Sequence, residues 1–346
     1  MTWIIGGVIA CIGLYAIVRF LSSNDTPALE SMSQTGAEFD APLWLFGTKS
    51  SEEWLLPREP GRKRVVVVDF SDPHKDSGDK DRDWLVDNAA FLLAETLWMR
   101  TDAPATAAVI VSLPLKKIIS PHDDAIAPYE NLSGLTSSFK EPAVVAWGAG
   151  NKDIAREGLT MKVRVSDETD ERSFTAPYLE LEKTLIDWLV GRGLCARKDP
   201  PAWYAPPKTE QLPLWAIVHH NLQLQTLADA KNHVLEPLAP DFQDDMVDYG
   251  LDAVEQLEGA GEQVKLAAIA SAVYARRANA LKEERRTKIL DIVAGLKHPD
   301  LVRLSPRFYV ALGEPARADA VKTDGDAYRT ADDAAYRQWL EKIHEA

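Results

Sequence analysis

The sequence predicts an α+β domain followed by an all-helical domain, both behind one membrane-spanning helix at the amino terminus. Three observations lead to this fold class. The stretch from Trp3 to Leu21 is apolar except for Arg19. Between residues 63 and 195, strand-like and helix-like patterns alternate. From residue 209 onward the strand patterns stop and only helical periodicity remains.

Residues 1–22 are predicted to form an uncleaved transmembrane anchor. As a helix, the apolar stretch is roughly 28 Å long, close to the ~30 Å hydrocarbon core of a bilayer. Only Met1 and Thr2 precede it, so the basic region of a signal peptide is missing, and no small-x-small cleavage site follows. The residues assigned to the anchor are Trp3, Ile4, Ile5, Gly6, Gly7, Val8, Gly13, Tyr15 and Arg19.

Basic residues follow the anchor and do not precede it. Arg19 ends the apolar stretch, and five more Lys and Arg residues occur between Lys49 and Arg64. Under the positive-inside rule, this asymmetry favours a single-pass protein of the bacterial inner membrane with its soluble body in the cytoplasm. A body in the periplasm is the alternative that this pattern leaves open.

The composition fits a water-soluble body with protein partners. Lys and Arg number 39 and Asp and Glu 53, which gives a formal net charge of −14. That balance argues against a surface for nucleic acid or anionic lipid. Of the two cysteines, Cys11 lies in the anchor, so Cys195 has no partner for a disulfide within the body. This pattern is typical of a reducing compartment.

Residues 23–62 are predicted to be a flexible tether that carries two aromatic islands. The part up to Asp40 is small, polar and acidic. The islands are residues 43–46 and 54–56, which are too short to cross a membrane. One interpretation is that Trp44, Phe46 and Trp54 contact a partner protein, because indole rings are common at partly solvent-exposed interfaces. The alternative is that the islands fold back and cover the core of the body.

The α+β domain, residues 63–195, begins with a βαβ unit. Val65 to Phe70 is a continuous β-branched run, which is typical of a strand buried on both faces. A polar loop leads to a helix from about Trp84 to Met99, with Asp83 placed to cap it. Residues 107–113 form the second strand of the unit.

The second half of this domain is predicted to be a strand, a hairpin and a closing helix. Residues 114–142 are rich in Pro, Ser and Asn and have loop character. Residues 143–147 form a strand that ends in a glycine turn. The alternating run 159–165 and the short run 173–175 form the hairpin. Residues 178–190 form an amphipathic helix that ends at glycine.

This order of elements resembles the amino-terminal domain of TolB-type proteins. The matching segments are the strand VVVVDF and the helix after it, the strand VVAWGAG, the hairpin MKVRVSDETDERSFTA and the helix YLELEKTLIDWLVGRGL. The resemblance covers about Lys63 to Cys195 and leaves residues 114–142 unmatched. It implies a non-catalytic domain that meets other proteins, and it carries over no catalytic residue.

Four prolines in residues 196–208 predict a stiff, extended linker, and residues 209–346 are predicted to be an all-helical domain. The predicted helices are 212–232, 242–257, 263–281, one around Ile289 to Leu296, 307–312 and 331–343. Proline and glycine breaks between them indicate helical hairpins. They would form either a short repeat array or an orthogonal bundle.

Two known site patterns begin with an aspartate after a strand, as Asp69 does here. The cation-binding pattern D-x-S-x-S fails because Pro73 stands where its second serine is required. The pattern D-x-D of phosphoryl transfer fails because Ser71 stands in place of the second acid. We therefore interpret Asp69 and Ser71 as parts of a strand-end turn.

The remaining candidates also lack a required feature. The acidic loop between Asp72 and Asp83 lacks the EF-hand spacing, and residues 148–150 lack the third glycine of a dinucleotide fingerprint. Neighbouring histidines such as His219 and His220 point about 100° apart on a helix, so they rarely bind one ion. No obvious histidine partner can be placed beside Cys195. We expect no catalytic residue, no metal and no cofactor.

The sequence therefore predicts a membrane-anchored, non-catalytic scaffold or assembly factor. Its expected partners are other proteins of a membrane-associated complex, and not nucleic acid. The alternative is a membrane-tethered sensor whose α+β domain binds a small ligand near residues 114–151. A pocket with convergent polar groups would favour the sensor. A broad apolar patch on the helical domain would favour the scaffold.

Overall fold

The structure is a computed structural model. It describes residues 34–48, 52–56, 62–74, 80–112, 116–118, 143–229, 234–324 and 334–342. Within that part of the chain, the residues from Thr35 onward belong to one compact unit. The predicted anchor at residues 1–22 lies outside it. None of the described helices is both long enough and apolar enough to cross a bilayer.

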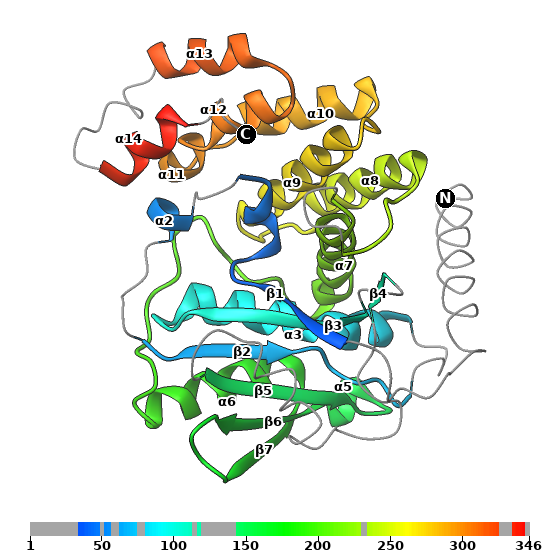
Figure 1. The fold of residues 1–346 in the computed structure, drawn as a ribbon, viewed down its shortest axis with the longest axis vertical. Coiled ribbons are helices and arrows are strands. Elements are labelled where there is room, and N and C mark those ends of the chain that lie inside the picture. Colours follow the sequence, from blue (N-terminus) through cyan, green and yellow to red (C-terminus); the bar gives the residue numbers. More distant parts are fainter. Residues whose placement is uncertain are drawn as a thin grey trace. The chain divides into compact units, whose positions relative to one another are not determined.

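A mixed β-sheet forms the first part of this unit (Figure 1). Its strand order is β1-β3-β2-β5-β6-β7, and the short β4 pairs with β3. The strands are β1 (Gln34–Phe39), β2 (Arg64–Val68), β3 (Ala105–Ser112), β4 (Lys117–Ile118), β5 (Ala143–Gly150), β6 (Leu159–Val165) and β7 (Glu171–Ala176). β2 pairs in parallel with both β3 and β5, whereas β5, β6 and β7 are antiparallel. The predicted βαβ unit and the predicted hairpin are therefore confirmed.

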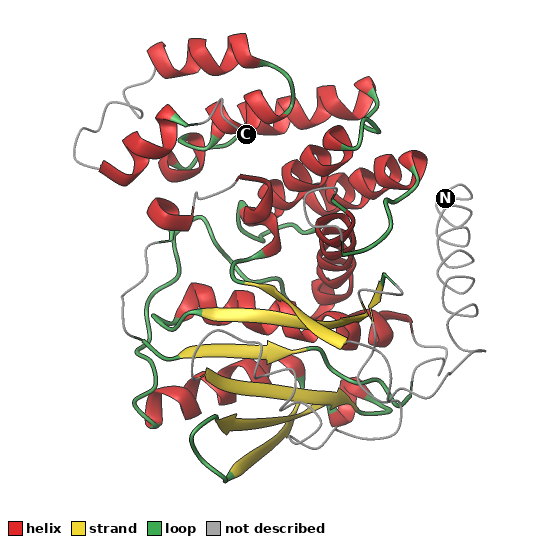
Figure 2. Cartoon of the chain, in the orientation of Figure 1, coloured by secondary structure: helices red, strands yellow, loops and turns green. Residues whose placement is uncertain are grey.

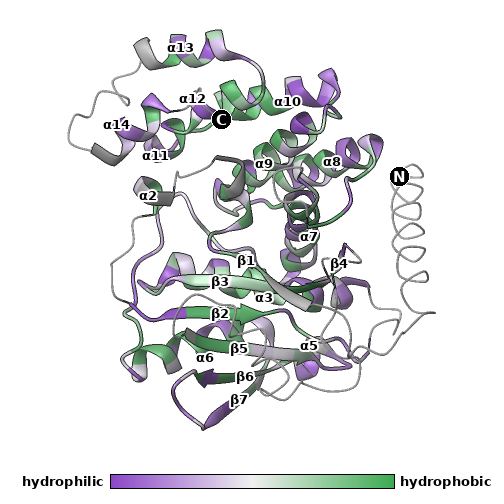
Figure 3. Cartoon of the chain, in the orientation of Figure 1, coloured by the Kyte–Doolittle hydropathy of each residue, from purple (hydrophilic) through white to green (hydrophobic). Residues whose placement is uncertain are grey.

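The burial of the strands follows their sequence patterns. All four valines of β2 are buried, as expected for a β-branched run in a central parallel strand. β6 alternates between buried and half-buried residues, so one of its faces is partly exposed to solvent, as predicted. Figure 3 shows the mainly hydrophobic β6 beside the hydrophilic edge strand β7, where charged residues protect a sheet edge.

β5 extends further than predicted, because the segment expected to turn continues the ladder. Gly148 and Gly150 still pair with β6. Glycine is required at 148 because the backbone approaches its neighbours closely there. A Cβ on Gly148 would lie 2.3 Å from the carbonyl oxygen of Thr160 and 2.5 Å from the Phe70 ring.

Two helices cover the sheet and also touch each other. α3 (Lys80–Arg100) connects β2 to β3 and packs on both strands, and α6 (Tyr178–Gly191) packs on β6 and β7. The predicted cap at Asp83 is wrong, because the helix begins three residues earlier. Asp83 instead lies in the first turn, where a negative charge favours the helix dipole.

The aromatic islands pack into the core, which is the second of the two interpretations. Residues 43–48 form the 3₁₀ helix η2 (Leu43–Thr48), and the next island forms α2 (Glu52–Leu55). Trp44 and Trp54 are buried, and the Trp54 ring meets Tyr336 and Trp339 edge to face. The described part of the predicted tether is thus packed structure. The side chain of Phe46 lies outside the described residues.

The second part of the unit is helical (Figure 2). Its elements are η3 (Thr209–Gln211), α7 (Leu212–Ala228), α8 (Pro240–Gln256), α9 (Gln263–Arg277), α10 (Glu283–Ala294), α11 (Pro299–Val302), α12 (Ser305–Ala311), α13 (Pro315–Asp324) and α14 (Ala334–Glu341). One more short helix, α5 (Ile154–Glu157), precedes β6. α8 and α9 pack side by side as a hairpin. The sequence did not predict α13.

The helical part shares one hydrophobic core with the sheet and its helices. α7 packs on α3, and η2 packs on α7 and α9. In the segment predicted to be a linker, Trp203 and Tyr204 are buried, and the Trp203 ring lies edge to face with Trp44 at 5.7 Å. One cluster of buried apolar residues runs through both parts. The structure therefore does not divide the chain at residues 196–208.

Candidate functional site

A cluster of buried polar side chains lies where the two parts of the unit meet. Its centre is a pair of carboxyl groups, Glu95 on α3 and Glu182 on α6, which are 2% and 7% exposed. Both line one small cavity together with residues of α7 and of the segment before η3. Buried carboxyl groups are rare and costly unless they are paired or bound to something, so this cavity is the candidate site.

Helix packing explains why Glu95 is cut off from water. α3 has the sheet on one side and α6 and α7 on others, so residues 85–99 are almost entirely buried. A helix covered on all sides has no wet face on which to place a charge. In the sequence, Glu95 lies inside the run from Leu92 to Trp98, where every other residue except Thr96 is apolar. An acid inside such a run is a signal that the sequence analysis missed.

Glu182 reaches the cavity from the edge of the buried face of α6. It lies one position from Leu181 and four from Tyr178, both of which are buried. Thr96 donates a hydrogen bond from Oγ1 to Oε1 of Glu182 at 2.8 Å. Burial raises the pKa of Glu182, and the positive charge of Arg100 acts in the opposite direction. The two acids are thus held by different partners.

Aromatic donors surround Glu95, and no cation of the described residues lies beside it. Nε1 of Trp44 donates to Oε2 at 2.8 Å. Burial raises the pKa of Glu95 to about 8, and the negative charge of Glu182 adds to the rise, whereas hydrogen bonds from Trp44 and Tyr204 oppose it. At neutral pH most of the Glu95 carboxyl is therefore protonated.

His219 on α7 lies directly beside Glu95. Its Nε2 is 3.1 Å from Oε2 of Glu95, but the atoms are not aligned for a hydrogen bond, and neither ring nitrogen makes one. Burial lowers the pKa of His219 to about 3. Because this pKa is far below that of Glu95, a proton shared by the pair resides on the carboxyl. The imidazole is neutral and adds no positive charge to the cluster.

Tyr178 is the polar group of the cavity wall that lacks a hydrogen bond. Its side chain is 3% exposed, and it lines the cavity. The hydroxyl makes no hydrogen bond of good geometry, but it lies near enough to Glu182 to act as a weak donor that lowers the pKa of that carboxyl. Burial raises the pKa of Tyr178 well above the usual value, so the phenol is neutral. Its oxygen can therefore accept a hydrogen bond from a further group.

The cavity is small and lies near the surface. Its volume of about 10 Å³ is room for roughly one water molecule. The apolar part of its wall consists of Leu92, Leu179, Pro206, Pro207 and Leu212. Leu179 is 37% exposed, the largest exposure of any bulky apolar side chain in the described ranges. The arrangement can hold a small polar group against two carboxyls and can store a proton.

The strand-end residues weighed as a metal or phosphoryl site continue the pairing of the sheet, and the turn follows them at Pro73 and His74, so the predicted turn at Asp69 and Ser71 is wrong. Asp69 accepts a hydrogen bond from the backbone N–H of Phe70 at 3.2 Å. Ser71 pairs with β5: its N–H donates to the carbonyl of Gly148 at 2.9 Å. Within the residues that the structure describes, no group of His, Cys, Asp and Glu is arranged to hold a metal ion.

The other two candidates are structural. The ring of His220 lies edge to face with Trp84 at 4.9 Å, whereas His219 lies beside Glu95. Cys195 is a buried free thiol. Burial raises the pKa of Cys195 to about 11, and the charge of Asp102 adds to the rise, although Arg62 and Arg197 oppose it. The thiol is therefore a poor nucleophile at neutral pH.

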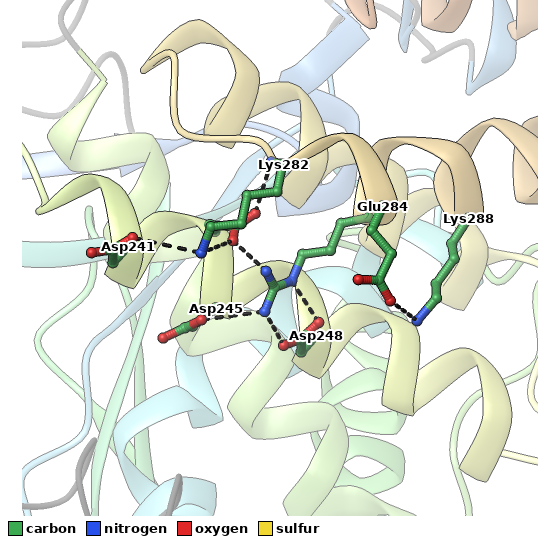
Figure 4. A network of polar contacts seen from close by, with 8 residues as sticks. Asp241, Asp245, Asp248, Lys282, Glu284 and Lys288 are labelled. Carbon is green, nitrogen blue, oxygen red and sulfur yellow. Dashed lines mark hydrogen bonds and ion pairs between the residues drawn. The ribbon is translucent and has the colours of Figure 1, made fainter.

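A second polar cluster joins α8 to α10 (Figure 4). Arg285 donates from Nε to Asp248 at 2.7 Å and also pairs with Asp244, whose side chain is fully buried. Lys282 lies 3.0 Å from the same Asp244 carboxylate. Because acids of α8 pair with cations at the start of α10, this cluster is a structural clamp. It differs from the cavity, whose lining holds two acids and no cation.

Comparison with known proteins adds no relative. No protein-family model matches the chain, and neither a curated protein nor a solved structure matches it. The resemblance to the amino-terminal domain of TolB-type proteins therefore stays a prediction.

Proposed function

We propose that the protein is a membrane-tethered sensor that binds a small ligand in the cavity between α3 and α6. The observation that carries this proposal is the convergence of Glu95, Glu182 and Tyr178 on one small cavity. Convergent polar groups with shifted pKa values in a cavity are typical of binding sites. The site lies outside residues 114–151, where the sequence analysis expected it.

Attachment to the bacterial inner membrane is part of the proposal and rests on residues 1–22. A body in the cytoplasm follows from the basic residues after the anchor. Protease added to spheroplasts is expected to leave a body-sized fragment intact. Digestion of the body without lysis would place it in the periplasm and would leave the cavity proposal unaffected.

The second proposal is that the protein is a non-catalytic scaffold or assembly factor that binds other proteins, as the resemblance to TolB-type proteins implies. The described surface offers little apolar area for docking, because Leu179 is its most exposed bulky apolar residue. Charge supports this proposal better, because the chain has a formal net charge of −14. A basic protein of a membrane complex is the partner that fits such a charge.

Intrinsic fluorescence tests the sensor directly, because Trp215 lines the cavity. Full-length protein in detergent micelles is titrated with a panel of small cations, anions and neutral polar molecules. The variant Glu182→Gln alters the cavity, and Glu180→Gln, an exposed position on the same helix, is its matched control. We expect at least one compound to bind the wild type and the control alike and the cavity variant at least tenfold more weakly. If no compound does so, the sensor proposal fails.

A further inference from the structure

We propose that the cavity binds the ammonium group of a small protonated amine, between Glu95, Glu182 and the hydroxyl of Tyr178. This inference rests on the proposed sensor function and names its ligand class. The carbon chain of the amine would leave the cavity past Leu179 and Pro206, which belong to its apolar wall. Three features of the site support this ligand: its charge balance, its acceptors and its size.

The charge balance leaves room for one cation. Groups that face Glu95 come from four elements: Trp44 from η2, Glu182 and Tyr178 from α6, Trp215 and His219 from α7, and Tyr204 from the segment before η3. None of them carries a positive charge, because His219 is neutral. Arg100 acts on Glu182. With both carboxyls ionised, the cluster therefore has one negative charge more than it has positive charges.

The acceptors match the donors of a primary ammonium group. Such a group has three N–H donors and no acceptor. The cavity wall offers two carboxyls and the Tyr178 oxygen, whose hydroxyl makes no hydrogen bond although the residue is buried. The side chains of Tyr204 and Trp215 complete the wall. An anion would find two acids there, so it is disfavoured.

The size of the cavity selects the head group. Room for roughly one water molecule also fits an ammonium group, but it does not fit a quaternary ammonium with four methyl groups. The upper limit on binding free energy per non-hydrogen atom gives methylammonium, which has two such atoms, a dissociation constant in the millimolar range. A longer amine gains further contact with the apolar rim.

Binding of a cation competes with protons at Glu95. The amine binds best when this carboxyl is ionised, so binding displaces a proton at neutral pH. Because the pKa of Glu95 is raised to about 8, affinity is expected to increase about 50-fold from pH 6 to pH 8. A structural cluster without a ligand would show no such dependence.

The experiment is a titration of the full-length protein with methylammonium chloride at pH 8, followed by tryptophan fluorescence at constant ionic strength. Ammonium, potassium and tetramethylammonium chlorides are the comparison salts. Ammonium chloride tests whether the ligand is the inorganic ammonium ion and not an organic amine. Tyr178→Phe removes only the unpaired hydroxyl, Glu182→Gln removes one acid, and Glu180→Gln is the control. Thermal melts of all four proteins verify that they fold.

We expect saturable binding of methylammonium, absence of binding by potassium and tetramethylammonium, and weaker binding at pH 6. Tyr178→Phe should weaken binding by roughly threefold to tenfold and Glu182→Gln by tenfold or more. Equal effects of all four salts, or binding that is independent of pH, would overturn the amine proposal. If a neutral or anionic compound binds instead and Glu182→Gln abolishes its binding, the sensor stands and the amine is refuted. If no compound binds at all, both proposals are refuted.

Discussion

Replacing Glu95 by glutamine should remove a specific pH dependence of folding stability. In the folded protein, burial raises the pKa of Glu95 from 4.5 to about 8. A raised carboxyl pKa means that the folded state binds more protons than the unfolded state between these two values. Its contribution to stability is therefore complete below pH 4.5 and is lost as the pH increases through 8.

His219 opposes this effect, but mainly at lower pH. Burial lowers its pKa from 6.5 to about 3, so the folded state binds fewer protons than the unfolded state between these values. Stability gained from His219 as the pH increases thus offsets part of the loss from Glu95, mainly below about pH 6.5. Above that pH, His219 adds only a few tenths of a kcal/mol as the remaining unfolded-state imidazole loses its proton. The loss from Glu95 between pH 6.5 and 8 is about 1–2 kcal/mol by proton linkage.

Urea unfolding at several pH values between 6.5 and 8, followed by tryptophan fluorescence, measures this loss. The free energy of unfolding of the wild type should decrease by about 1–2 kcal/mol more than that of Glu95→Gln over this range. Glutamine keeps an oxygen that can accept from Trp44, and its amide can donate to His219, so the variant should fold. A wild-type stability that is flat over this range, or an equal slope in the variant, would refute the protonation state assigned to Glu95.

Three further predictions concern the packing of the described unit. Asp244→Ala should lower the free energy of unfolding by about 3 kcal/mol in urea denaturation, because Arg285 loses a buried partner. Asp241→Ala, at an exposed position, is the control and should change the free energy of unfolding by less than about 0.5 kcal/mol. Gly148→Ala should destabilise by about 1–3 kcal/mol, since its Cβ would clash with Thr160, whereas Gly191→Ala has open space; a thermal melt that ranks them in the reverse order would contradict the packing. A fragment of residues 209–346 should lack a cooperative melt by circular dichroism, because the face of α7 that packs on α3 would be exposed. A sharp transition in that fragment would show that the shared core is dispensable.

The strands and long helices could be predicted because each has a pattern of its own. The β-branched run of β2, the alternation of β6 and the breaks around α8 are local signals. The burial of Trp44 and Trp203 is not local, because it depends on contacts between segments about 160 residues apart in the sequence. Proline-rich and tether-like composition predicts solvent exposure for such segments, and tertiary packing overrides it here.

The cavity escaped the sequence analysis for the same reason. Glu95 and Glu182 are 87 residues apart, and each alone has the appearance of a surface acid on a helix. Only the packing of α3, α6 and α7 brings them together. The one available signal was the apolar run around Glu95, since an acid between Leu92 and Trp98 has no wet face to occupy.

The position of the cavity makes the two proposed functions compatible. α7 contributes Trp215 to the cavity wall and His219 to the surroundings of Glu95, and it packs on both α8 and α9. A shift of α7 on ligand binding would therefore reach the helical part of the unit. If a basic partner bound to the helical part alters the affinity of the cavity for its ligand, the ligand must alter the affinity for the partner by the same factor. Measuring amine binding with and without a captured partner would reveal such a coupling, and equal affinities in both cases would show that the cavity and the helical surface act independently.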